Sequence, residues 1–125
     1  MRLARAQDGF TLPDVLIGMV ILVVVSLGLM SLTVSLIRGN VFSRQLTAAT
    51  VLAQDQLEQV KRLGYRDANT AAGTEAYGSM TAYPFYKRVT VVTNDTPVPA
   101  IKTVKVTVFW NADVRKVDVQ TLVAE

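Results

Sequence analysis

The feature that most constrains this sequence is an uninterrupted apolar segment near its N-terminus. No charged residue occurs from Val15 to Ile37, and large aliphatic side chains would surround the helix that this segment forms. A helix needs about 20 apolar residues to cross the hydrocarbon core of a bilayer. A helix that is apolar on all sides is buried in lipid or in a larger assembly. We therefore expect the segment to lie in a membrane or in an assembly.

A short basic segment, which carries Arg2 and Arg5, precedes the apolar run. Positive charge at this place holds an N-terminus on the cytoplasmic side. An ordinary secretory signal has a shorter apolar core that ends in small residues. Here the apolar run continues into Arg38-Gly39-Asn40 without such a cleavage pattern. Hydropathy alone therefore favours a plain signal-anchor helix.

The junction between the two segments reads Gly9-Phe10-Thr11-Leu12-Pro13-Asp14 and resembles the processing site of type IV prepilins and pseudopilins. In that family a prepilin peptidase cuts after the glycine and methylates the new N-terminal phenylalanine. The resemblance implies a leader over residues 1–9, a cleavage site at Gly9 and Phe10, and N-methylation of Phe10. It also implies a transmembrane and filament-core helix over residues 10–37.

The same resemblance implies where the protein is located and which partners it has. The chain would cross the bacterial inner membrane once, with its N-terminus cytoplasmic and its head periplasmic or extracellular, and would then enter a pilus or pseudopilus. The implied partners are the prepilin peptidase and other pilins or pseudopilins.

Asp14 is an isolated acid beside the apolar helix, where an unpaired carboxylate is costly. In the resembled family the acid at this position pairs with the amino terminus of its own or a neighbouring subunit and sets axial register. The family normally has glutamate there, and Asp14 is shorter by one methylene, about 1.5 Å. Alternatively, Asp14 caps the helix, with Pro13 marking the chain that enters it. The two roles are compatible.

The helical pattern continues beyond Ile37 as an amphipathic helix. Apolar residues recur there at steps of three and four, and polar residues fill the other face. The recurring positions are Leu46, Ala49, Ala53, Leu57, Val60 and Leu63. Gly64 is a suitable helix stop. A single helix from Pro13 to Leu63 would be about 75 Å long.

The C-terminal part carries three strand signals. Phe85–Thr93 and Val114–Val123 are rich in β-branched residues, and Ile101–Trp110 alternates between apolar and polar positions. Asn111-Ala112-Asp113 predicts a tight turn, so the last two strands should form a hairpin. Residues 65–83 show no period and are expected to be a long loop that can include one short strand.

These elements predict an α+β fold, in which a long helix with an apolar half and an amphipathic half packs on a small antiparallel sheet, as in type IV pilins. Residues 38–125 would form the head, a meander of three strands with one face covered by the amphipathic half. The tail from Lys102 to Val123 and the stretch Leu52–Glu58 are similar to minor pilins of the pilus-modification type and to I-type minor pseudopilins of type II secretion.

No catalytic constellation emerges from the composition. The chain has no cysteine and no histidine, which removes the thiolate nucleophile, the commonest general base and the commonest metal ligand. The stretch Asn94-Asp95-Thr96 is too sparse in oxygen ligands for calcium. We therefore expect no enzyme, no cofactor and no metal site.

The charge balance argues against a strong nucleic-acid partner. The net charge of +3 falls to +2 when the leader, with Arg2, Arg5 and Asp8, is removed, which is too little to indicate DNA binding. An aromatic and basic stretch, Tyr83–Arg88, could stack on DNA or a glycan, although ordinary strand packing explains it as well.

Three functions remain open at this stage. The first is a minor pilin or pseudopilin that helps to initiate or decorate a type IV pilus or a secretion pseudopilus. The second is a filament-associated binding module, either an adhesin or a DNA-uptake receptor. The third is a plain single-pass membrane protein with an external domain.

Overall fold

The computed structural model describes Gly9 and residues 11–125 of the chain. The predictions for residues 1–8 and Phe10, including the leader and the N-methylation site, lie outside the described residues. The chain divides after Val41 into two compact units, which are described separately below. The first contains the apolar half of the helix, and the second, Phe42–Glu125, is the head.

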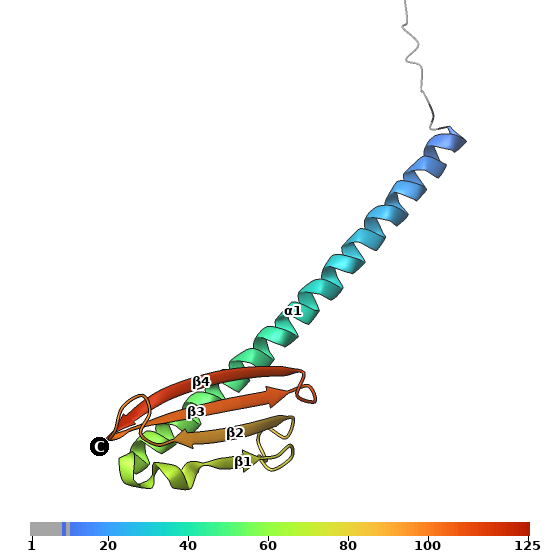
Figure 1. The fold of residues 1–125 in the computed structure, drawn as a ribbon. Coiled ribbons are helices and arrows are strands. Elements are labelled where there is room, and N and C mark those ends of the chain that lie inside the picture. The colour runs from blue at the N-terminus through green and yellow to red at the C-terminus, as the bar shows by residue number, and fades with distance from the viewer. Residues whose placement is uncertain (1–8, 10) are drawn as a thin grey trace, which may run out of the picture. The chain divides into compact units, whose positions relative to one another are not determined.

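Helix α1 spans Leu12–Asp67 and passes through the expected weak point at Arg38–Asn40 without a break (Figure 1). Regular helical geometry is interrupted at Gly64, whose φ of 74° places it in the left-handed region that favours glycine. The predicted helix stop at Gly64 is therefore confirmed. A short 3₁₀ helix, η1, follows at Ala68–Ala71.

The head contains a four-stranded antiparallel sheet in the order β1-β2-β3-β4. The strands are β1 Gly73–Glu75, β2 Tyr86–Thr93, β3 Ile101–Trp110 and β4 Arg115–Ala124. The predicted meander of the last three strands and the hairpin turn are confirmed. The short strand allowed within residues 65–83 is present as β1, which lies at the edge of the predicted three-stranded meander and brings the sheet to four strands.

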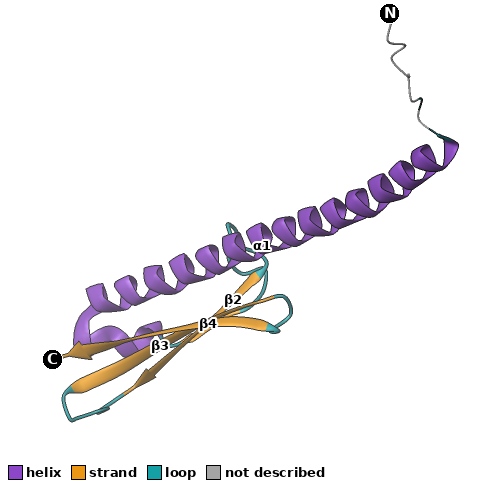
Figure 2. Ribbon diagram, turned by 90° about the horizontal axis from the view of Figure 1, so that it is seen from above, coloured by secondary structure: helices purple, strands orange, loops and turns teal. Residues whose placement is uncertain are grey.

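The second part of α1 covers one face of the sheet, as Figure 2 shows from above. Along β3, Val104, Val106 and Val108 are fully buried, and the residues between them face away from the core. The helix contributes a matching face, made of Ala49, Leu52, Ala53, Leu57 and Val60. Burial of each large aliphatic side chain contributes about 1.5–3 kcal/mol, so this contact is the main source of stability in the head.

Two residues predicted for the apolar face of the helix are not fully enclosed by the head. Leu46 is 37% exposed and Leu63 is 45% exposed. Leu46 lies near the start of the head, and Leu63 immediately precedes the break at Gly64. The helical period identified the correct face, but it does not say where along the helix the sheet begins and ends.

Candidate functional site

The first turn of α1 holds the acid that the sequence singled out. Asp14 is the third residue of the helix, and its Oδ2 accepts hydrogen bonds from the Thr11 hydroxyl at 2.9 Å and from the Thr11 N–H at 3.4 Å. The Thr11 carbonyl in turn accepts from the Asp14 N–H at 3.0 Å. This is one half of a capping box: the acid in the first turn accepts from the N–H of the cap residue, while the Thr11 hydroxyl bonds to the carboxylate instead of to the Asp14 N–H.

The predicted capping role of Asp14 thus takes a different form from the one expected. Thr11 occupies the cap position, and Pro13 lies inside the first turn rather than before the helix. The reason is that threonine caps well and proline is tolerated within the first turn, where no N–H is needed. Asp14 is exposed, and its Oδ1 makes no hydrogen bond to the described residues.

The apolar half of α1 is exposed on every side. Its aliphatic side chains from Leu12 to Ile37 are about half to three-quarters exposed, with Leu12 at 76% and Val34 at 47%. Among the described residues, α1 is the one helix that is long and apolar enough to cross a membrane. Such exposure is unfavourable in water and favourable in hydrocarbon.

Three of the four serine and threonine side chains between Val15 and Ile37 are hydrogen-bonded within the helix itself. Ser26 donates to the Leu22 carbonyl at 2.7 Å, Thr33 to the Leu29 carbonyl at 2.9 Å, and Ser35 to the Ser31 carbonyl at 3.1 Å. These three hydroxyls therefore need no water, which is the condition for a polar group at membrane depth.

In the head, the two cations of the predicted aromatic and basic stretch are engaged by the protein. Arg88 is buried at 7% exposure, pairs with Glu75, and donates to the Leu52 carbonyl of α1 at 3.1 Å. Lys87 donates to Asp113 at 2.6 Å and lies over the Phe109 ring at 4.7 Å. Both charges are paired with carboxylates in the structure, so the stretch Tyr83–Arg88 presents little uncompensated positive charge to a phosphate.

A buried lysine on β3 contacts the end of the helix. Lys102 is 6% exposed and donates to the Tyr65 carbonyl at 2.6 Å, with its ammonium 4.4 Å from the centre of the Tyr65 ring. A cation at the C-terminal end of a helix is favourable because the last carbonyls there lack partners. Lys102 lies two residues before Val104 and therefore on the same, core side of β3.

Asp113, in the β3–β4 turn, takes part in three hydrogen bonds. Its carboxylate accepts from Lys87 and, at 2.8 Å, from the Tyr77 hydroxyl, while its own N–H donates to that hydroxyl at 3.1 Å. The hydrogen bond from Lys87, which has the larger effect, and the one from Tyr77 hold the pKa of Asp113 below its ordinary value. The pKa of Tyr77 is raised, mainly by desolvation and next by its hydrogen bond to Asp113. The network connects the loop before β2 to the turn after β3.

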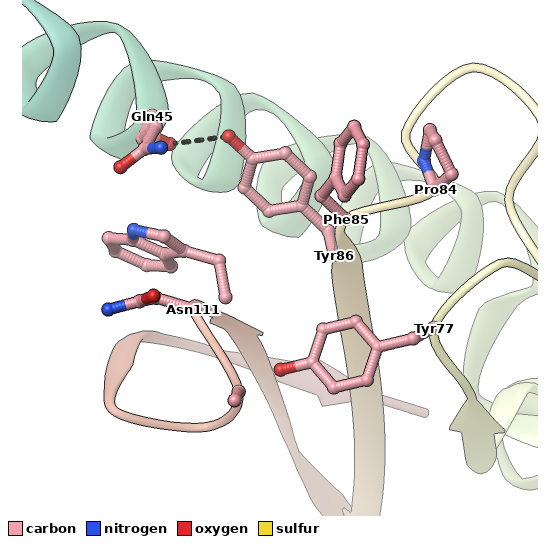
Figure 3. Close-up of a pocket in the computed structure, with 8 residues that line it drawn as sticks. Gln45, Tyr77, Pro84, Phe85, Tyr86 and Asn111 are labelled. Atoms are coloured by element: carbon pink, nitrogen blue, oxygen red, sulfur yellow. Dashed lines mark hydrogen bonds between the residues drawn. The ribbon is translucent and has the colours of Figure 1, made fainter.

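An aromatic pocket lies beside this network (Figure 3). It has a volume of about 660 Å³, and none of its lining residues is charged. The lining consists of Gln45, Tyr77, Pro84, Phe85, Tyr86, Trp110, Asn111 and Ala112. The sequence identified Trp110 as part of the sheet core, which its 3% exposure confirms, but gave no signal for the pocket.

Comparison with family models, with curated proteins and with solved structures returned no match. Within the described part of the chain, no three side chains of histidine, cysteine, aspartate or glutamate come together as metal ligands. The features that indicate a function are therefore the junction at Gly9, the apolar helix and the head surface.

Proposed function

We propose that this chain is a minor pilin or pseudopilin, a structural subunit that helps to initiate or decorate a type IV pilus or a type II secretion pseudopilus. The observation that carries the proposal is the stretch from Gly9 to Asp14, which leads into a helix whose apolar half is exposed on every side. Such a half has to be covered by lipid before assembly and by neighbouring helices afterwards.

The capping box suggests how Asp14 takes part in assembly. Its carboxylate turns back to the N–H of Thr11, one residue from the amine that cleavage after Gly9 would create at Phe10. Thr11 is the next residue after the new terminus, so we propose that the Asp14 carboxylate also pairs with the new ammonium. Asp14 then pairs with its own amine in the single subunit and exchanges it for a neighbour's amine in the filament.

Mass spectrometry of the membrane-extracted protein tests the processing step. In cells with an active prepilin peptidase, the mature chain should begin at Phe10 and carry one added methyl group. Gly9→Glu should leave the leader attached. Gly18→Ala is the matched control, because an added Cβ at Gly18 meets nothing within 4 Å and should leave processing unchanged.

Incorporation into filaments tests the role of Asp14. Asp14→Ala should be cleaved but should be lost from sheared filament fractions, whereas Asp14→Glu keeps the charge and should be retained. If the protein still begins at Met1 and never co-fractionates with filaments, it is instead a plain membrane-anchored protein.

A further inference from the structure

The aromatic pocket of the head is not used by the proposed assembly function. It lies entirely within Phe42–Glu125 and is open to solvent at Phe85, whose side chain is 80% exposed. Its volume of about 660 Å³ falls within the range of small-molecule sites, roughly 300–1,000 Å³. The exposed Phe85 ring offers apolar surface at the rim of the cavity, and covering such surface is favourable in water.

The walls of the pocket are held in place before any ligand arrives. Tyr77 is fixed by its hydrogen bonds with Asp113, and the Tyr86 hydroxyl donates to the Gln45 carbonyl of α1 at 3.3 Å, as Figure 3 shows. Asn111, Ala112 and Asp113 all have positive φ, at 56°, 53° and 66°. Three successive non-glycine residues in this region are strained, and strain of this kind is retained where the surrounding structure enforces it.

The free polar groups of the pocket are side-chain amides and an indole. Within the described residues, the amides of Gln45 and Asn111 make no hydrogen bond, and each offers both a donor and an acceptor. Trp110 is 3% exposed, and its indole N–H is buried without an acceptor. A buried donor without a partner is unfavourable, so a ligand that brings an acceptor to this wall is favoured.

Charge decides between the classes of ligand. A nucleic acid requires cations for its phosphates, yet no lining residue is charged and Lys87 is bound to Asp113. A free carboxylate or ammonium would be desolvated here without a counter-charge. The ligand that matches is uncharged, has an apolar face to lie on aromatic rings, and carries groups that both donate and accept hydrogen bonds.

We propose that this pocket binds a neutral sugar ring. The C–H face of a pyranose packs on Phe85 and Tyr77, and its hydroxyls pair with the amides of Gln45 and Asn111. One sugar oxygen accepts from the Trp110 N–H once the half-buried Gln45 side chain moves aside. This inference is independent of the proposed filament function and holds for the head in either case.

Nuclear magnetic resonance on the full-length protein tests the sugar assignment directly, because the chain has one tryptophan and hence one indole N–H signal. The protein is kept in phosphocholine micelles, since sugar-headed detergents would compete. Neutral disaccharides of glucose, galactose, mannose and N-acetylglucosamine are titrated separately. At least one should shift the indole signal saturably, with a Kd of about 1–10 mM.

Two variants and one control locate the binding. Phe85→Ala removes an exposed ring and should weaken binding roughly two- to tenfold. Asn111→Gly removes the amide at a position whose positive φ suits glycine, and should also weaken binding. Leu122→Ala, at an exposed residue that does not line the pocket, should leave the affinity unchanged.

The opposite results overturn the proposal. No indole shift with any disaccharide at roughly 50 mM, several times the expected Kd, excludes a sugar site. A shift produced only by a proline-rich peptide or by single-stranded DNA would assign the pocket to that ligand instead. Equal weakening by Leu122→Ala would show that the shift reports a general change in the head.

Discussion

The two halves of α1 are made of similar residues but depend on different surroundings. In the apolar half, Leu22 is 66% exposed and Leu29 is 61% exposed, whereas in the head Leu57 is 6% exposed. In the head, the helix face that points away from the sheet carries polar residues. The apolar half has no charged residue from Val15 to Ile37. Both halves form a helix. They differ in what covers their apolar side chains, which is the sheet in the head but no part of the described chain in the apolar half.

The largest expected effect comes from truncating the same residue type in each half. Leu57→Ala should lower the free energy of unfolding of the head by about 2–5 kcal/mol, because it leaves a cavity against the sheet. Leu29→Ala, the matched change in the apolar half, should alter it by less than about 0.5 kcal/mol. Denaturant unfolding followed by Trp110 fluorescence measures both. Equal losses would show that the two halves unfold as one unit.

A second prediction concerns the buried cation of the head. Arg88→Met removes the donor to the Leu52 carbonyl and leaves Glu75 without its partner, so the free energy of unfolding should fall by about 1–3 kcal/mol. Glu75→Gln keeps an acceptor for Arg88 but leaves that buried charge without a counter-charge, so it should also lower the free energy of unfolding. Amide exchange of Gly73–Glu75 should rise in both variants. Unchanged exchange there would mean that β1 is held by its backbone pairing alone.

The third prediction uses pH to separate the two halves. The Thr107 hydroxyl, followed by Lys105 and Lys116, lowers the pKa of Asp118, and Lys87 and Tyr77 lower that of Asp113. A carboxyl whose pKa is lowered by folding stabilises the head above its unfolded pKa, about 4. That stability is lost as the pH falls through the lower folded value.

Unfolding of the head, measured between neutral and strongly acidic pH, should therefore show a loss of stability below about pH 4. The variant with both Asp113→Asn and Asp118→Asn should show a shallower loss. The uncharged half of α1, Val15–Ile37, has nothing to titrate, and its helix content should stay constant. A wild-type head that is equally stable throughout this range would contradict the assignment.

The smallest expected effect lies at the beginning of the apolar half. Thr11→Ala removes the hydroxyl that bonds to Asp14, and should loosen only the first turn, by about 0.5–2 kcal/mol. Faster amide exchange should appear near Asp14 and Val15 and nowhere in the head. Thr33→Ala, which removes a hydroxyl bonded within the helix, is the control and should change neither.

Much of the fold could be predicted from the sequence because its patterns are periodic. The helical period found the buried face of α1, Gly64 marked its interruption, and the alternation in Ile101–Trp110 gave β3 its correct bounds. Strand β1 was missed as a definite element because three residues are too few to show alternation. It is held instead by its pairing with β2 and by the contact of Glu75 with Arg88, which are 13 residues apart in the chain.

The candidate sites were predictable to different degrees. Asp14 stood out because an acid beside an apolar helix is rare, but the partner of its carboxylate, Thr11, emerged only from the geometry of the first turn. The pocket could not be predicted, since Gln45, Tyr77 and Asn111 come from three separate elements and loops. Its residues are individually ordinary, and only the folded head brings them together.

The uniform exposure of the apolar half also affects how such a segment can be oriented. A helix that is equally apolar on all sides has no preferred rotational orientation. It can therefore rotate about its own axis in lipid with little change in free energy. Any fixed angle in an assembly has to be imposed by a directional group, such as the carboxylate of Asp14, or by contacts of the head. Substitutions along the helix would then change how tightly neighbours fit, while the choice of neighbour is made elsewhere in the molecule.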